Sequence, residues 1–439
     1  MIAPRESARE LDTFGAFLLF GVFPMKEYNT LDDFNFKDKT VILRVDINCP
    51  LNKEDMTLED DNRIVQVLPT IRELLAKQAK VVIIAHQGRP GDWDYCPLDQ
   101  HARALSEHLG IDVAYVDDLY GDVAKKAIRS MRPGDAIVLK NVRYMQCEQE
   151  KRSMEEHSRS DLVQNLAPLA DYYVSDAFGA AHRAHCSLIG FQAVLPSAAG
   201  RLLEKELTAL GEVFDDPKRP CVFVLGGSKF ADSIKVIDRV LTKNIADWVI
   251  LVGLSGNALL KARGVDLGPA SEEILMKEFT QENLDSARKI LHEKGAKILL
   301  PHDVAVDANG KRVELNVGDL PSEYPIMDVG THSAAKFSKV VHTAGTVFMS
   351  GPAGVFERDE FALATKELMM AAVSGHAFTV IGGGHTVSAA EKFGLFDRFS
   401  YVSTGGGALE TYLLGKPMPV VEALKAAYQR GLAKCQGSH

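Results

Sequence analysis

The chain has 439 residues, of which 46% are hydrophobic and 25% are charged, and its formal net charge is -9. A globular chain of this length is too long for one ordinary hydrophobic core, so we expect two domains. The acidic balance excludes a general electrostatic attraction to nucleic acids or anionic membranes, and we expect neither as a partner.

Two features bear on the compartment and on the start of the chain. The six cysteines are widely scattered without a CxxC pair, which indicates reduced thiols in a cytoplasmic protein and no zinc site. The apolar run 14–23 is too short to span a bilayer, and acidic residues precede it, unlike the basic start of a secretory signal. We therefore expect residues 1–24 to be an extension that is either poorly ordered or precedes a physiological start at Met25.

Predicted strands and amphipathic helices alternate in the first part of the chain. The strands are expected at 40–45, 80–85, 111–116, 136–139 and 172–174, and the helices at 63–76, 99–109, 122–130 and 161–169. Near-continuous apolar strands separated by amphipathic helices are typical of a parallel sheet that is covered on both faces. We place this first domain at 25–198.

Polar or cationic side chains follow four of these predicted strands. They lie in the segments Asp46–Asn48, His86–Pro90 and Asn141–Arg143, and in the stretch 172–191, which holds Asp176, His182, Arg183 and His185. Ligands of parallel sheets bind beyond the carboxyl ends of the strands. Cations crowded together there repel one another unless an anion lies among them, so we expect an anionic substrate at this edge. Arg63, at a helix start, is either a further member of this group or an ordinary surface charge.

The second part of the chain follows a predicted amphipathic connecting helix at 201–214. Three strands there run into glycine-rich turns, at 226–229 (GGSK), 382–386 (GGGHT) and 404–407 (TGGG), and a helix is expected after each. Glycines let backbone amides approach phosphate oxygens, and a helix N-terminus adds a favourable dipole. The turns therefore predict a nucleotide polyphosphate site. None of them matches the P-loop or the GxGxxG fingerprint, which argues against a dehydrogenase.

The predicted fold class is α/β, with two Rossmann-like doubly wound parallel-sheet domains joined by a connecting helix and a hinge. We place the second, nucleotide-binding domain at 199–405, and we expect the C-terminal segment 406–439 to pack back on the first domain. The segments 196–201 and 403–407 are the hinge candidates.

Eight segments, in chain order, resemble the motifs of the phosphoglycerate kinase family. They are RVDINCPL (44–51), HQGRP (86–90), LKNVRY (139–144), SDAFGAAHRAH (175–185), LGGSKFADSIKVI (225–237), GPAGVFE (351–357), GGGHT (382–386) and STGGGALE (403–410). The resemblance runs from about residue 29 to the C-terminus, and three motifs are similar to the archaeal branch. It implies reversible in-line phosphoryl transfer between 1,3-bisphosphoglycerate and ADP, giving 3-phosphoglycerate and ATP, with Mg²⁺ and domain closure.

The resemblance also implies roles for individual residues. The substrate-binding residues would be Asp46, Asn48, Arg63, His86, Arg89, Arg143 and Arg183. The nucleotide-binding residues would be Gly226, Gly227, Lys229, Gly253, Glu357, Gly383, Gly384, His385 and Thr386, with adenine near 253–257 and the ribose near Glu357. The residues that act on the phosphoryl group in transfer would be Arg63, Lys229, Gly383 and Gly406.

Three positions depart from the family pattern. Ser233 stands where many members have a second lysine, His385 where many have an aspartate near the Mg²⁺-nucleotide, and Ser350 where an asparagine is common. We therefore assign no metal ligand. These departures are the only support for the alternative, a regulatory protein that binds nucleotides and anions without turnover. Lys229 and the complete set of Arg and His residues speak against that alternative.

Overall fold

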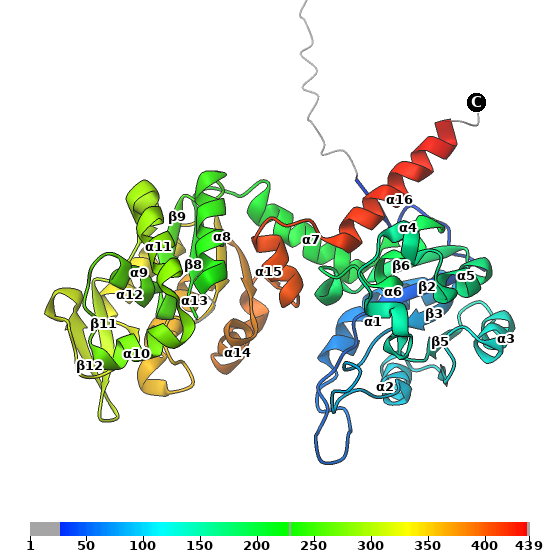
Figure 1. Cartoon of the computed structure of the whole chain (residues 1–439), viewed down its shortest axis with the longest axis horizontal. Coiled ribbons are helices and arrows are strands. Elements are labelled where there is room, and N and C mark those ends of the chain that lie inside the picture. Colours follow the sequence, from blue (N-terminus) through cyan, green and yellow to red (C-terminus); the bar gives the residue numbers. More distant parts are fainter. Residues whose placement is uncertain (1–26, 228–229, 437–439) are drawn as a thin grey trace, which may run out of the picture.

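The structure is a computed structural model that describes residues 27–227 and 230–436. Figure 1 shows two lobes, each built on its own sheet, with the helix α7 (Arg201–Phe214) between them. The expected N-terminal extension and Lys229 lie outside the described residues. In the described part of the chain, no helix combines the length and the hydropathy needed to cross a membrane.

The first lobe contains a seven-stranded parallel sheet in the order β1-β7-β6-β2-β3-β5-β4. Its strands are β1 (Asn29–Thr30), β2 (Thr40–Val45), β3 (Lys80–Ile84), β4 (Val113–Val116), β5 (Ala136–Leu139), β6 (Tyr172–Asp176) and β7 (Ser197–Ala199). Its helices are α1 (Asn62–Ala76), α2 (Asp99–Leu109), α3 (Asp122–Ser130), α4 (Met154–His157), α5 (Asp161–Leu166) and α6 (Cys186–Ile189).

Alternate residues of β2 enter two different hydrophobic cores. Val41 and Leu43 pack in the core that contains Ile64 of α1, whereas Ile42 packs in the core that contains Ile128 of α3. Successive side chains of a strand point to opposite faces, so both faces of the sheet need a helical cover. The doubly covered parallel sheet predicted from the apolar strands is therefore confirmed.

The second lobe is built on a six-stranded parallel sheet in the order β10-β9-β8-β14-β15-β16. Its strands are β8 (Cys221–Leu225), β9 (Trp248–Leu251), β10 (Ile298–Leu299), β14 (Thr346–Ser350), β15 (Phe378–Gly382) and β16 (Tyr401–Val402). Its helices are α8 (Phe230–Thr242), α9 (Gly253–Ala262), α10 (Pro269–Glu278), α11 (Gln281–Lys294), α12 (Thr331–His342), α13 (Leu363–Ser374), α14 (Gly384–Lys392) and α15 (Gly407–Leu413).

The second lobe repeats the two-core arrangement of the first. Phe223 of β8 packs in the core with Ile237 of α8, whereas Val222 packs in the core with Phe337 of α12. A small antiparallel sheet, which the sequence pattern did not predict, is added to this lobe. It consists of β11 (Asp303–Ala308), β12 (Lys311–Asn316) and β13 (Ile326–Val329).

The predicted elements differ from the observed ones mainly at their ends. The helix predicted at 161–169 ends at Leu166, and a 3-10 turn continues to Leu169. The cause is Pro168, whose ring leaves no backbone N–H for a helical hydrogen bond. The strand predicted at 111–116 begins only at Val113.

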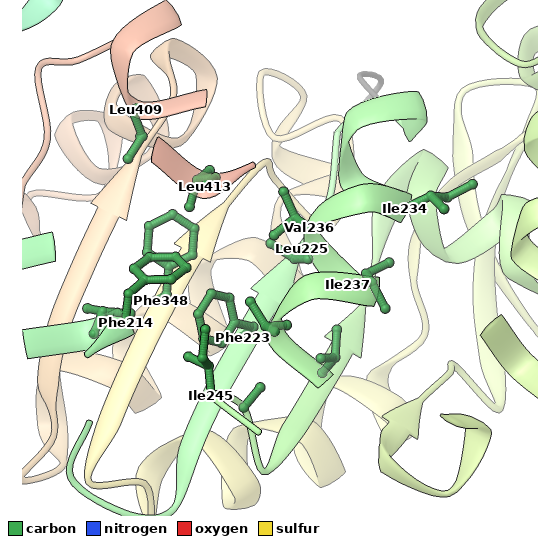
Figure 2. Close-up of a cluster of buried hydrophobic side chains, with 14 of the residues drawn as sticks. Phe214, Phe223, Leu225, Ile234, Val236, Ile237, Ile245, Phe348, Leu409 and Leu413 are labelled. Carbon is green, nitrogen blue, oxygen red and sulfur yellow. The ribbon is translucent and has the colours of Figure 1, made fainter. Parts of the chain in front are cut away.

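The helix α7 is bound to both lobes. At its start, the Leu203 amide donates to the buried Asp176 carboxylate at 3.0 Å, and Arg201 pairs with Glu73 at 2.7 Å. At its end, Phe214 packs edge-on against Phe223 of the second sheet, with ring centroids 5.5 Å apart (Figure 2). Each lobe therefore holds one end of the same helix.

The C-terminal helix α16 (Pro419–Gln436) lies against the first lobe (Figure 1). The Val420 amide donates to the Ala181 carbonyl at 3.3 Å, and the Arg430 guanidinium donates to the Gln192 carbonyl. The chain thus passes between the lobes twice, through α7 and again before α16. The assignment of 25–198, 199–405 and 406–439 as functional domains stays a prediction.

Candidate active site

The four strands with polar exits are neighbours in the first sheet, in the order β6-β2-β3-β5. All four run parallel, so their carboxyl ends meet at one edge. We call the basic side chains at this edge the basic face: Arg63, His86, Arg89, Arg143 and Arg183. Arg63 comes from the start of α1, and its guanidinium lies 2.8 Å from the Asp46 carboxylate, so it belongs to this edge.

Asp46 and Asn48 organise the turn beside the basic face. The Asp46 carboxylate, which is 8% exposed, accepts hydrogen bonds from Arg63 and from the Asn48 amide at 3.3 Å. The Asn48 side-chain oxygen accepts from the Gly88 amide at 2.8 Å. Gly179 packs so closely that a Cβ there would lie 2.5 Å from Asp46 Oδ2. The exits of β2, β3 and β6 are therefore fixed to one another.

Burial and neighbouring positive charges lower the pKa of three basic side chains at this edge of the sheet. Burial, and then the nearby Arg183, lowers the pKa of Arg143 to about 10. Burial is also the main cause that lowers the pKa of His86 well below its usual range, and Arg44 and Arg143 act in the same direction. The pKa of His185 falls to about 3 for the same reasons, burial first and Arg183 next. An anion bound here would relieve this repulsion.

A buried layer of charge that we did not predict lies behind the basic face. Arg44, only 1% exposed, donates through Nε to Ser187 Oγ at 2.9 Å, and its Nη2 lies 3.1 Å from His86 Nδ1. The equally buried Glu148 accepts from the Ser187 amide at 2.8 Å and from its hydroxyl at 2.6 Å. Because a guanidinium can only donate, the contact with Arg44 makes His86 Nδ1 the acceptor and leaves the proton of the neutral ring on Nε2. The sequence held one sign of this layer, because Arg44 is a charged residue inside the apolar run TVILRV (40–45).

We expected Asp176 to lie at the ligand edge of the sheet beside the basic face, and this expectation is wrong. Its side chain is fully buried and accepts a hydrogen bond from the start of α7. Burial raises the pKa of Asp176 to about 6. The side chain of a strand's last residue still alternates with its neighbours, and at Asp176 this alternation points the carboxylate toward α7 rather than toward the ligand edge.

His182 lies where the basic face approaches the second lobe. Its Nε2 accepts from Arg183 Nε at 3.2 Å. A Cβ on Gly407 would lie 3.1 Å from His182 Nε2, and one on Gly405 would lie 2.3 Å from the ring of Phe178. The loop 403–407 therefore packs directly on the segment that carries Arg183.

The glycine-rich turns of the second lobe line a common cavity of about 260 Å³. We call the lining residues that come from the turns after β8, β14, β15 and β16 the glycine-rich face: Gly226, Gly227, Ser350, Gly351, Gly383, Gly384, His385, Thr386 and Gly406. They meet because β8, β14 and β15 are neighbours in the sheet. Gly407, by contrast, lies against His182 and does not line this cavity.

Two of the turns pack backbone to backbone, which only glycine permits. Gly351 has φ +88°, and a Cβ on it would lie 2.3 Å from the backbone of Gly226. The Gly351 amide donates to Thr386 Oγ1 at 2.7 Å. The hydroxyl of Thr386 therefore supports the turn as well as lining the cavity.

A second cavity of about 290 Å³ continues from the glycine-rich face. It shares Gly227, Pro352 and His385 with the first cavity and is also lined by Gly253, Leu254, Asn257, Val304, Ile326 and Glu357. Its walls are mostly apolar, and the carboxylates that line it belong to Asp328 and Glu357. Together, the two cavities offer amides and a hydroxyl at one end and an apolar slot at the other.

The three departures from the expected motifs have definite places. Ser350, Ser233 and His385 all line the glycine-rich cavity, whereas Lys235 is exposed on α8.

Among the described residues, no group of three His, Cys, Asp or Glu side chains is arranged to hold a metal ion. Of the residues that the structure describes, Glu410 is the one whose carboxylate lines the glycine-rich cavity. One carboxylate suits a Mg²⁺ ion that arrives on the phosphates of a nucleotide, since such ions use few protein ligands.

Comparisons with known proteins agree on one family. A model of the family described as phosphoglycerate kinase matches residues 31–416. Phosphoglycerate kinase of Methanopyrus kandleri is 46% identical over 397 residues, which cover 90% of this chain and 97% of that protein. The enzyme of Methanothermus fervidus is 39% identical, with coverage of 92% and 99%. The crystal structure of phosphoglycerate kinase from Pyrococcus horikoshii superposes with a TM-score of 0.81 at 39% identity, covering 91% of this chain and 99% of that one.

Proposed function

The chain belongs to the phosphoglycerate kinase family, and on this premise we propose that its basic face binds the phosphoglycerate and its glycine-rich face binds the nucleotide phosphates. The protein is a phosphotransferase with a carboxyl group as acceptor, and it transfers a phosphoryl group reversibly between 1,3-bisphosphoglycerate and ADP. The alternative of a regulatory protein without turnover is not favoured.

The basic face suits a small substrate that carries a phosphate and a carboxylate. Arg143, Arg183 and Arg63 supply guanidinium donors, which form paired hydrogen bonds with phosphate and carboxylate oxygens. His86, with its proton on Nε2, offers a neutral donor at the same edge. Asp46 and Asn48 provide acceptors for the glycerate hydroxyl. This combination would hold the substrate by both of its ends and leave the reacting carboxylate pointing toward the second lobe.

The two cavities of the second lobe suit the two parts of a nucleotide. We place the phosphates over the amides of the glycine-rich face and the start of α14, where the helix dipole favours an anion. The base lies in the apolar slot beside Gly253 and Asn257, and the ribose lies near Glu357. When bound, Mg²⁺ would neutralise charge on the nucleotide phosphates, and Glu410 is the residue placed to contact it.

In the direction that consumes ATP, a carboxylate oxygen of 3-phosphoglycerate forms a bond to the γ-phosphorus as the bond to the β-phosphate oxygen of ADP breaks. No nucleophile or base from the protein is required, because the attacking oxygen carries no proton. The protein aligns the two substrates and neutralises charge on the oxygens of the phosphoryl group in transfer. The cations of the basic face and the amides of the glycine-rich face approach that group from opposite lobes.

The observation that carries this proposal is the packing of the loop 403–407 on the segment 178–182. Gly405 touches Phe178, and Gly407 touches His182, so the turn that contains Gly406 adjoins the segment that contains Arg183. A rotation of the lobes about this contact would bring the two faces together and exclude water. The segments 196–201 and 403–407 are the proposed hinges.

A crossed binding experiment tests which face binds which ligand. We would measure the dissociation constants of 3-phosphoglycerate and of ADP by calorimetry for Arg89→Ala and Glu357→Ala, two exposed positions on opposite lobes. Arg89→Ala should weaken the binding of 3-phosphoglycerate about tenfold, which corresponds to the loss of one charge-assisted hydrogen bond, and leave the binding of ADP unchanged. Glu357→Ala should do the reverse. If either variant weakened both ligands equally, the assignment of the two faces would be wrong.

A further inference from the structure

A third cavity, of about 510 Å³, lies in the second lobe outside both parts of the nucleotide site. It forms at β10, the two-residue edge strand of the second sheet. The helix α11 covers one face of this sheet and α12 covers the other, and residues of both helices line the cavity beside this strand. We call this space the edge cavity.

The edge cavity is lined by basic side chains from four separate elements. Arg263 follows α9, Arg288 and His292 are one turn apart on α11, His302 precedes β11, and Lys336 lies on α12. Within residues 27–227 and 230–436, no carboxylate lines the cavity. In a chain with a net charge of -9, such a concentration of basic groups is a local feature rather than a consequence of composition.

The contacts of these side chains leave the cavity positive. Lys336 Nζ lies 2.9 Å from His302 Nε2, so the imidazole is the acceptor and the ammonium keeps its charge. The Asp303 carboxylate is turned to the start of α12, where it accepts from the His332 amide at 2.9 Å and the Ser333 amide at 2.7 Å. In the part of the chain that the structure describes, Arg288 is the one of these side chains with an ion pair to a carboxylate, with Asp285 at 2.5 Å, and this pair is exposed to solvent.

The rest of the lining is apolar. Leu291, Leu299 and Phe337 line the same space between the cations. A volume of this size is in the range of small-molecule sites, of about 300–1,000 Å³, in which a few polar groups orient a largely apolar contact. Guanidinium groups and an ammonium suit a phosphate group, because they match its geometry and charge and can donate to several of its oxygens.

We propose that the edge cavity is a second ligand site, which binds a small phosphorylated organic compound through Arg263, Arg288 and Lys336. The site is separate from that of the nucleotide. Pro301 and Val304 line the nucleotide slot, whereas Leu300 and His302 line the edge cavity, and the two cavities share no residue. The ligand therefore binds while the active site is occupied.

The histidine rings make this site directly observable. We would follow the ring resonances of His292 and His302 by ¹H–¹³C NMR while titrating the full-length protein with inorganic pyrophosphate, with a sodium chloride titration at matched ionic strength. Both resonances should shift along a saturating curve with pyrophosphate and not with chloride. The ring of His86, in the basic face, reports separately on pyrophosphate bound there.

A pair of double variants provides the control. Arg263→Ser/Lys336→Ser should weaken the pyrophosphate binding reported by His292 at least tenfold. Lys289→Ser/Lys339→Ser removes two exposed charges from α11 and α12 without altering the cavity lining, and it should change that binding less than twofold. Shifts that fail to saturate, or equal weakening by the two double variants, would overturn the proposal.

Discussion

The buried pair of Arg44 and Glu148 shows how single residues support the basic face. Both side chains are 1% exposed, and both bond to Ser187. Burial raises the pKa of Glu148, and the Arg44 charge is the largest influence that opposes this rise. Each charge therefore depends on the other for compensation in a medium of low polarity.

Removing one charge of this pair should lower the free energy of unfolding more than removing both charges. We expect Arg44→Met to lower the free energy of unfolding by about 3–5 kcal/mol, because it leaves the Glu148 carboxylate buried without its cation. Adding Glu148→Gln should restore part of that loss. Urea denaturation of the two single variants and the double variant measures the difference. A double variant no more stable than Arg44→Met would show that the two charges are not coupled.

His101 should make the stability of the protein depend on pH. This ring is fully buried, donates from Nε2 to Gln87 at 3.1 Å, and has its pKa lowered to about 4 by burial. Between pH of about 4 and 6.5 the unfolded chain binds a proton that the folded chain does not, so stability falls as the pH falls through this window. The slope from this one group is about 1.4 kcal/mol per pH unit.

Replacing His101 by a residue that does not titrate should remove that slope. We expect the free energy of unfolding of His101→Gln to change less between pH 6.5 and 4 than that of the wild type, whatever its value at pH 7. Urea denaturation at several pH values measures both slopes. Parallel curves for the two proteins would mean that His101 is protonated equally in the folded and unfolded states.

The sequence predicted the ligand edge of the site better than the layer of charge behind it. His86, Arg143 and Arg183 follow apolar strands, so the rule for parallel sheets was enough to place them at one edge. Arg44 and Glu148 could not be paired from sequence, because they are more than one hundred residues apart and meet only in the folded core. Asp176 was misjudged because the direction of a side chain at a strand end depends on the neighbouring helix.

At the scale of elements, α7 and the loop 403–407 act together. Glu206 of α7 is fully buried and accepts hydrogen bonds from Ser403 Oγ at 2.8 Å and from the Thr404 amide and hydroxyl, both at 2.7 Å. The helix that joins the lobes thereby holds the loop that carries Gly406. We infer that this contact positions the loop during closure.

Removing the Glu206 carboxylate should affect both stability and turnover. We expect Glu206→Ala to lower the free energy of unfolding by about 1–3 kcal/mol, because it leaves the buried donors of Ser403 and Thr404 unsatisfied. We expect kcat to fall while the KM values change little. Glu212→Ala, an exposed carboxylate on the same helix, is the control. Equal behaviour of the two variants would exclude a role for Glu206 in positioning the loop.

Elements with a strong apolar pattern were predictable, and those without one were not. The helix at 201–214 was predicted with its observed bounds because Leu203, Leu210 and Phe214 recur on one side. The strand β12 (KRVELN) is polar and largely exposed, so its pairing with β11 depends on backbone hydrogen bonds that leave no hydrophobic signal. The approach of Gly351 to Gly226 is also a tertiary contact that local sequence cannot show.

At the scale of the whole molecule, the proposed function requires that the lobes move, because it assigns the two substrates to different lobes. These lobes are joined by α7 and the loop 403–407. We therefore expect the radius of gyration from small-angle X-ray scattering to fall when 3-phosphoglycerate and MgADP are both bound, and to fall less with either ligand alone. MgADP avoids turnover during the measurement. No compaction in the ternary complex would contradict the hinge assignment.

The most direct test of the basic face is the rate of phosphoryl transfer in a variant of its central residue. A coupled assay would measure kcat/KM for 3-phosphoglycerate with MgATP in wild type, Arg183→Ala and Arg159→Ala, an exposed arginine of the same lobe. We predict a loss of about one to two orders of magnitude in Arg183→Ala, because a charge-assisted hydrogen bond used in transfer is worth about 1.5–3 kcal/mol, and no significant change in Arg159→Ala. Full activity in a folded Arg183→Ala variant would contradict the assignment of the basic face to the substrate.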